Sequence, residues 1–178
     1  MKRTFSVIFF LSVLLLSKCY CADIDVIFSP QAGALDKIVE SLDNAQASIN
    51  LAVYKLYNEA FSDALLRAHN RGVDVRVILD GSKHAKKDSK YDLLKQKGMN
   101  VIVFTPPSGG HMHHKFCVVD EELIITGSYN WNYSAEEDNN ETLLFIKNDK
   151  ELIKKFIHEF NKIWNMKSGS EEESNVRN

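Results

Sequence analysis

The residues best suited to chemistry lie in one short stretch of the chain, from His111 to Glu141. His113 and Lys115 are two positions apart in a segment that is expected to be a strand. Because successive side chains of a strand alternate between its faces, both should point to the same side. A neutral imidazole there can act as a nucleophile, and the neighbouring ammonium can bind phosphate oxygens as a compact charge. This pair therefore indicates chemistry at phosphorus.

Three further polar residues can reach the same site. Ser128 and Asn130 are again two positions apart, directly after a predicted strand, so both side chains can converge as hydrogen-bond partners. Glu141 begins the next predicted strand, where a carboxylate could hold an imidazole in one tautomer.

A metal site is the main alternative, because His111 and His114 flank His113 and imidazoles are common zinc ligands. His114, however, should point to the opposite face of the strand from His113. No acidic residue stands close enough along that strand to complete a usual ligand set. We therefore expect no metal and no other cofactor, with His111 lining the mouth of the site. The basic loop at 83–90 follows a strand end, and it is either a solvated loop or a region that attracts phosphate.

The hydrophobic pattern of the chain predicts strands that alternate with helices. Strands are expected at 25–28, 49–54, 73–79, 101–104, 113–119, 123–126 and 142–146, and helices at 33–47, 59–70, 89–96 and 150–164. Several of these strands are almost continuously apolar, which is typical of strands covered on both faces. The pattern predicts an α/β fold in which helices sandwich a mixed β-sheet.

The N-terminus differs from the rest of the chain. A basic start at Lys2 and Arg3 precedes an apolar run at 5–16, and small or polar residues then lead to Ala22. This order predicts a secretory signal peptide at 1–21, with an uncleaved membrane anchor as the alternative. We therefore expect an exported protein, periplasmic or secreted, with no stable membrane span after cleavage.

The remaining chain is expected to form one domain at 22–167, followed by a polar, acidic tail at 168–178. Loss of the segment 1–21 would change the formal charge from −2 to −5, because it contains three basic residues and no acidic ones. A strongly basic surface for duplex nucleic acid is thus absent overall, although a site can be locally basic. Cys117 would be the one cysteine left, which excludes an internal disulfide, and its apolar neighbours indicate an inert buried thiol.

The polar residues follow the spacing His113-x-Lys115-x4-Asp120-x6-Gly127-Ser128-x-Asn130, with Glu141 eleven positions beyond Asn130. This pattern resembles the signature of the phospholipase D superfamily, and the resemblance covers nearly the whole chain after residue 21. The stretch at 64–80 is also similar to that family. Because the pattern occurs once, the chain is most similar to the small single-motif subgroup, which includes bacterial endonucleases and mitochondrial cardiolipin hydrolase-like proteins.

The resemblance implies a phospholipase D-like fold and a mechanism with two imidazoles. One His113 would attack phosphorus and form a phosphohistidine. The His113 of a second subunit would protonate the leaving oxygen and then activate water, so the protein would be a homodimer with a shared active site.

Roles for the other residues also follow from the resemblance. Lys115 and Asn130 would hold the phosphoryl oxygens, with Ser128 supporting the site, and Glu141 would orient the imidazole. Asp120 and Gly127 belong to the signature, and the part of Asp120 would be mainly structural, in the strand turn.

The resemblance implies a metal-independent phosphodiester hydrolase, and the single motif, the small size and the predicted export signal favour an endonuclease acting on DNA or RNA. The alternative is a phospholipase D that hydrolyses phosphatidylcholine or cardiolipin to phosphatidic acid. The acidic charge favours the lipid, whereas the lack of an amphipathic membrane helix favours nucleic acid. A third hypothesis, a binding scaffold with an inactive site, is disfavoured because every residue of the signature is present.

Overall fold

The computed structural model describes residues 21–30 and 32–176, with side chains described as far as Lys167. The strands are β1 (Asp23–Ser29), β2 (Ser48–Val53), β3 (Asp74–Asp80), β4 (Asn100–Phe104), β5 (Lys115–Val119), β6 (Leu123–Gly127) and β7 (Glu141–Lys147). The helices are α1 (Ala34–Asp43), α2 (Glu59–Asn70), α3 (Tyr91–Gln96), α4 (Tyr133–Glu137) and α5 (Lys150–Val176). Strands and helices alternate along the first half of the chain, and the α/β prediction is confirmed.

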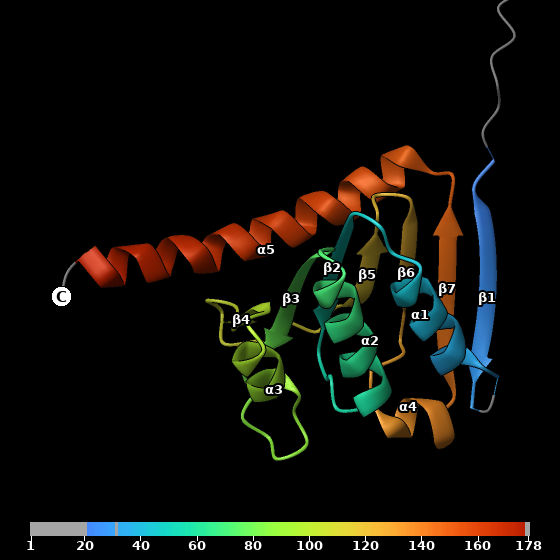
Figure 1. The fold of residues 1–178 in the computed structure, drawn as a ribbon, viewed down its shortest axis with the longest axis horizontal. Coiled ribbons are helices and arrows are strands. Elements are labelled where there is room, and N and C mark those ends of the chain that lie inside the picture. The colour runs from blue at the N-terminus through green and yellow to red at the C-terminus, as the bar shows by residue number, and fades with distance from the viewer. Residues whose placement is uncertain (1–20, 31, 177–178) are drawn as a thin grey trace, which may run out of the picture.

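The seven strands form one mixed sheet in the order β1-β7-β6-β5-β2-β3-β4 (Figure 1). β2, β3 and β4 run parallel and are joined by the crossover helices α2 and α3. The other neighbours pair antiparallel, from β2 through β5, β6 and β7 to β1. The central position of β2 explains its near-continuous apolar sequence, because helices cover both of its faces.

Two apolar clusters hold the helices against the sheet. On one face, Ile38 of α1 and Leu65 of α2 pack with Leu51 of β2. On the other face, α5 crosses the strands obliquely, and its Phe160 packs with Ala52 of β2 and Val118 of β5. Leu51 and Ala52 are neighbours in sequence and belong to opposite clusters, as the alternation of a strand requires.

The first helix is shorter than the predicted range 33–47, and long-range contacts explain its end. α1 stops at Asp43, and the backbone amides of residues 46–48 bind the carboxylate of Asp120, which is more than seventy residues away in sequence. Those amides are therefore not available to continue the helix. The structure also contains the short helix α4, which was not predicted, and α5 continues past the predicted end at residue 164 to Val176.

No helix within the described residues is both long and apolar enough to span a bilayer. The predicted signal peptide falls almost entirely on residues 1–20, which lie outside the described part of the chain. The division into a signal peptide, a domain at 22–167 and a tail at 168–178 stays a prediction.

Candidate active site

Most of the candidate residues meet at one end of the central strands of the sheet. β2 ends at Val53, and its partner at that point is Lys115, the first residue of the antiparallel strand β5. β6 ends at Gly127 beside the start of β7, where Glu141 lies. Ligand sites of α/β proteins gather where parallel strands end, and β2 and β3 both end at this end of the sheet.

The structure brings the side chains of His113 and Lys115 together. His113 lies just before β5, and the ladder continues past it, since the amide of Tyr54 donates to the carbonyl of His114 at 3.0 Å. The ammonium of Lys115 is 3.2 Å from Nδ1 of His113 and 2.9 Å from the carbonyl oxygen of the same residue. The His113 side chain is exposed, so a substrate can reach it.

The surroundings favour the neutral form of the imidazole. Partial burial lowers the pKa of His113, and the positive charge of Lys115 lowers it further. Partial burial also lowers the pKa of Lys115, while the carboxylate of Glu141 acts in the opposite direction. A neutral imidazole beside a cation is the protonation state that nucleophilic attack on a phosphate needs.

Glu141 contacts Ser128 in the structure and does not contact His113. The hydroxyl of Ser128 donates to one oxygen of Glu141, and the amide of Asn139 donates to the other at 3.0 Å. The backbone amide of Thr142 in turn donates to the Ser128 hydroxyl at 3.1 Å. None of the hydrogen bonds among the described residues joins Glu141 to His113, so the orienting role expected of Glu141 has no counterpart within one chain.

Gly127 and Asn130 lie at and just after the end of β6. Gly127 has a φ of 151°, and a Cβ atom there would lie 1.9 Å from the carbonyl oxygen of Thr142. A glycine is therefore required for β6 to approach β7 and turn Ser128 into the site. The side-chain oxygen Oδ1 of Asn130 is buried and, within the described part of the chain, makes no hydrogen bond. Such an unsatisfied group costs about 1–3 kcal/mol and is more often tolerated at functional sites than elsewhere.

Asp120 follows the last residue of β5, at the opposite end of that strand from Lys115 and far from the other signature residues. Its carboxylate accepts the backbone amides of Gln46, Ala47 and Ser48 at 2.9, 2.7 and 2.9 Å. Burial acts to raise the pKa of Asp120, but the three amide hydrogen bonds outweigh it and lower the pKa. These contacts join the turn after β5 to the segment that leads into β2.

Tyr54 is a central residue of the site that was not predicted from the sequence. Its ring centroid lies 4.4 Å from that of His113 and 5.5 Å from that of His111. Three ammonium groups also lie within 6 Å of the ring centroid, those of Lys83 at 5.0 Å, Lys115 at 5.3 Å and Lys55 at 5.8 Å. Tyr54 was assigned to the apolar strand at 49–54, and only its place at the end of a central strand could have indicated a site.

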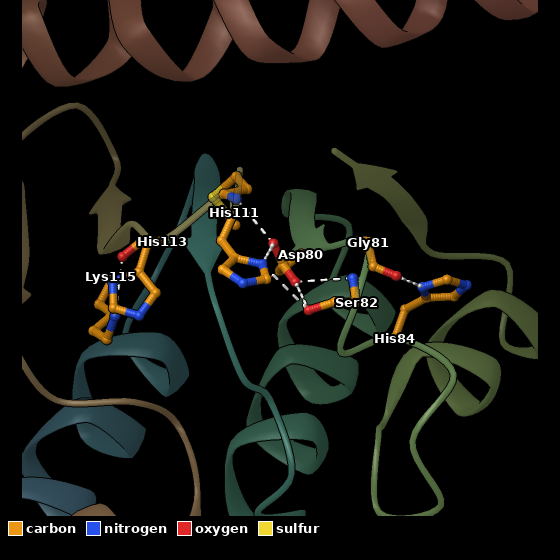
Figure 2. A network of polar contacts seen from close by, with 8 residues as sticks. Asp80, Gly81, Ser82, His84, His111, His113 and Lys115 are labelled. Atoms are coloured by element: carbon orange, nitrogen blue, oxygen red, sulfur yellow. Dashed lines mark hydrogen bonds and ion pairs between the residues drawn. The ribbon is translucent and has the colours of Figure 1, made fainter. Parts of the chain in front are cut away.

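A buried carboxylate anchors the loop that carries His111 (Figure 2). Asp80 is 1% exposed and accepts hydrogen bonds from the backbone amide of Met112 at 2.8 Å, and from the amide and hydroxyl of Ser82 at 2.9 and 2.5 Å. Nδ1 of His111 lies 3.5 Å from the Asp80 carboxylate and 3.4 Å from the Ser82 hydroxyl. Figure 2 shows this group on one side and the pair of His113 and Lys115 on the other.

His114 points away from this cluster and toward α5. Its Nε2 lies 3.5 Å from the carboxylate of Glu159, and its ring contacts Phe116 at a centroid distance of 5.4 Å. Among the described residues, no three His, Cys, Asp or Glu side chains are grouped so that they could hold a metal ion. Cys117 is fully buried, and burial raises the pKa of its thiol, as expected for an inert side chain.

Comparison with known proteins finds one family model and several relatives to which the chain is similar. Residues 38–164 match the family model described as "Cardiolipin synthase, PLD-like domain". The mitochondrial cardiolipin hydrolase of Homo sapiens is 37% identical over 131 residues, which cover 74% of this chain and 51% of that protein. The corresponding protein of Chlamydomonas reinhardtii is 33% identical over 139 residues, covering 78% of this chain and 61% of the relative. A phospholipase D of Rickettsia prowazekii is 33% identical over 136 residues, covering 76% and 65%.

Solved structures agree with this result. Nuc from Salmonella typhimurium, described as a phospholipase D family member, has a TM-score of 0.75 at 26% identity and covers 81% of this chain and 95% of its own. NucT from Helicobacter pylori has the same TM-score at 25% identity, with 81% and 96% covered. The chain thus spans nearly all of these two structures but about half to two thirds of the three curated relatives.

The comparisons also correct the expected location. Export to the periplasm or the medium was predicted from the N-terminal segment, and this prediction is wrong, because the relatives from Chlamydomonas and human are mitochondrial proteins by name. The Rickettsia relative is bacterial. A basic start followed by a short apolar run indicates affinity for a membrane, but it does not specify which membrane.

Proposed function

Because the chain belongs to the phospholipase D superfamily, in the small subgroup that carries the motif once, we propose that it hydrolyses phosphodiesters through a phosphohistidine intermediate without a metal ion. The observation that carries this proposal is the 3.2 Å approach of the Lys115 ammonium to Nδ1 of an exposed imidazole whose pKa is lowered. The nucleophile and the charge that stabilises the phosphoryl oxygens are then both side chains of the protein.

Substrate binding would rearrange this pair. In the free chain the ammonium of Lys115 donates to Nδ1 of His113, and this hydrogen bond occupies the one acceptor nitrogen of the neutral imidazole. The phosphoryl oxygens are stronger acceptors and would take over the lysine's hydrogen bonds, together with the amide of Asn130. His113 is then free to form a bond to phosphorus while the bond from phosphorus to the leaving oxygen breaks.

The leaving oxygen needs a proton, and we propose that the His113 of a second subunit supplies it. The second imidazole, having given up its proton, would take one from the water that hydrolyses the phosphohistidine. A two-fold axis beside the exposed face of His113 would place the two rings on opposite sides of phosphorus. The same arrangement would give Glu141 and Ser128 a partner imidazole to contact, which they lack within one chain.

A nucleic-acid strand is the substrate that we favour. The chain has a formal charge of −2, yet Lys55, Lys83 and Lys115 gather around one aromatic ring at the site. A local concentration of cations in an otherwise acidic protein attracts a polyanion to that place rather than to the whole surface. The half-buried ring of Tyr54 beside them is also the kind of group on which unpaired bases stack.

A phospholipid is the second candidate, and one feature of the structure favours it. A pocket of about 460 Å³ adjoins His113 and contains the apolar residues Phe104, Pro106, Pro107, Met112, Ile163 and Met166. Such a surface could receive the apolar part of a lipid next to the reacting phosphate. The curated relatives also include proteins named as a cardiolipin hydrolase and a phospholipase D.

Two measurements test the proposal. Intact-mass spectrometry under alkaline conditions, after rapid mixing with excess substrate, should detect a phosphoryl adduct that is absent from His113→Asn. Initial rates on single-stranded DNA, RNA and vesicles of cardiolipin or phosphatidylcholine should be highest for one of the nucleic acids. Turnover without any adduct on His113 would contradict the mechanism, and turnover of vesicles alone would favour the lipid candidate.

A further inference from the structure

Two residues near the reacting pair, His111 and Lys83, take no part in the proposed chemical steps. The rings of His113 and His111 both lie against the Tyr54 ring, and His111 also faces the carboxylate of Asp80. The ammonium of Lys83 is 5.0 Å from the centroid of the same ring. Neither His111 nor Lys83 belongs to the spacing that defines the reacting residues.

Asp80 holds the backbone of both residues in place. Its carboxylate accepts the amide of Met112, next to His111, and its carbonyl accepts the amide of Lys83 at 3.1 Å. Gly81, between Asp80 and Lys83, is itself tied to β4, because its backbone amide donates to the carbonyl of Phe104 at 3.0 Å. A buried carboxylate that makes several hydrogen bonds is a rigid anchor, so the two side chains are presented by a fixed frame.

The directions of the two side chains suit an anion. Nδ1 of His111 faces the Asp80 carboxylate and the Ser82 hydroxyl, so this nitrogen can donate to them. In the doubly protonated ring, Nε2 is a second N–H donor from which an anion can accept a hydrogen bond. The His111 side chain is 52% exposed, whereas the Asp80 side chain is 1% exposed and is already occupied by its own donors. A hydrogen bond to Tyr54 also raises the pKa of Lys83, so its ammonium stays charged.

We propose that His111 and Lys83, which both lie beside the Tyr54 ring, form a second phosphate-binding subsite next to the reacting phosphate. Its ligand is the phosphate that neighbours the cleaved one along a single nucleic-acid strand. The inference rests on the proposed function, because the reacting phosphate must sit between His113 and Lys115 for the neighbour to reach this subsite. The subsite gives the enzyme a preference for substrates with consecutive phosphates.

Short dinucleotides test the subsite directly. TpT contains one phosphodiester, and pTpT and TpTp carry one additional phosphate on the 5′ or the 3′ side. We expect the wild type to cleave one of the two phosphorylated forms with kcat/KM about tenfold higher than TpT, a typical effect of one charge-assisted contact. His111→Gln and Lys83→Gln should each remove most of that advantage. The exposed residues His158 and Lys95 provide matched controls, and His158→Gln and Lys95→Gln should keep the advantage.

The outcomes separate the subsite from the proposed function. Bis(p-nitrophenyl) phosphate has a single phosphate and reports on phosphodiester hydrolysis alone. If the wild type cleaves neither this compound nor any other diester, the proposed function fails. If it cleaves diesters but all three dinucleotides have equal kcat/KM, or the advantage survives in His111→Gln and Lys83→Gln, the subsite is wrong. Cleavage of bis(p-nitrophenyl) phosphate and cardiolipin vesicles but of no dinucleotide would also overturn it.

Discussion

The ammonium of Lys115 lies 3.2 Å from Nδ1 of His113 and also donates to that residue's backbone carbonyl at 2.9 Å. Both side chains are thereby held at the end of the sheet where β5 begins beside the last residue of β2. The cation lowers the pKa of the imidazole, in addition to the effect of partial burial. Lys115 thus has two proposed effects: it lowers the pKa of His113, and it stabilises the negative charge of the phosphoryl oxygens. The two effects can be measured separately.

Replacing Lys115 with methionine tests both effects. Lys115→Met keeps most of the side-chain volume and removes the charge, so kcat should fall by about 10²–10³, the usual loss when a group that stabilises transition-state charge is removed. The His113 pKa, followed by NMR, should rise because the neighbouring cation is gone. His114→Gln is the control, because His114 points toward Glu159 of α5, and its activity should be within about twofold of the wild type. A normal kcat in Lys115→Met would exclude Lys115 from the chemistry.

The dependence of activity on pH follows from the lowered pKa of His113. The ordinary pKa of a histidine is 6.5, and burial and Lys115 both disfavour the charged form, so this imidazole stays neutral to a lower pH than an isolated one. The acidic limb of kcat/KM against pH should therefore have its midpoint below 6.5. Activity should fall again at higher pH, where the imidazole that must donate a proton has lost it, and the two apparent pKa values belong to the pair. A profile that is flat from about pH 5 to 9 would contradict a mechanism with paired histidines.

Chelation tests whether the chemistry is carried by side chains alone. Activity in millimolar EDTA should equal that of untreated enzyme, because His113 and Lys115 supply the nucleophile and the positive charge. Magnesium and zinc added back at micromolar to millimolar concentration should produce no stimulation. Loss of activity in EDTA with recovery on addition of one of these ions would overturn the histidine mechanism.

Asp120 should affect stability rather than chemistry. Asp120→Asn keeps the side-chain shape and the positive φ of 53°, but it weakens the binding of the backbone amides at 46–48. Hydrogen bonds to charged groups contribute about 1.5–3 kcal/mol, so the free energy of unfolding should fall by about 1–3 kcal/mol with little change in kcat. Glu122→Gln, at an exposed residue of the same turn, is the control.

The pH dependence of stability gives a second check on Asp120. The folded state lowers the pKa of this carboxyl below its ordinary value of 3.8. The stabilisation from this group is therefore complete above that value and is lost as the pH falls through the folded pKa. Asp120→Asn should lack this part of the acid-induced loss of stability, and an identical acid dependence in both proteins would contradict the assigned role.

The sequence predicted those parts of the fold that depend on local periodicity. α2 was predicted at its observed bounds, since Phe61, Leu65 and Ala68 form a regular stripe. The end of α1 was not predictable, because it depends on Asp120, more than seventy residues away. α4 has five residues, too few to show a helical period.

The same distinction applies to the site. Spacing within one strand correctly predicts that His113 lies beside Lys115 and that His114 points to the other face. The contacts of Tyr54 and Asp80 join three strand ends and a loop, and nothing in the local sequence of either residue indicates them. The contact expected between Glu141 and His113 was inferred from the place of Glu141 at a strand start and from family resemblance, and it does not occur within one chain, where Glu141 binds Ser128.

Two chains should share one active site through their two copies of His113. Equal amounts of wild-type and His113→Ala chains, unfolded together and refolded, would pair at random, so about a quarter of the dimers would carry both histidines. Nucleophile and acid act as a unit, so a mixed dimer should be almost inactive. The shared-site account predicts that activity per mole of total chain falls to about a quarter of that of refolded wild type. Retention of about half of the activity, or full activity in a species that light scattering shows to be a monomer, would contradict it.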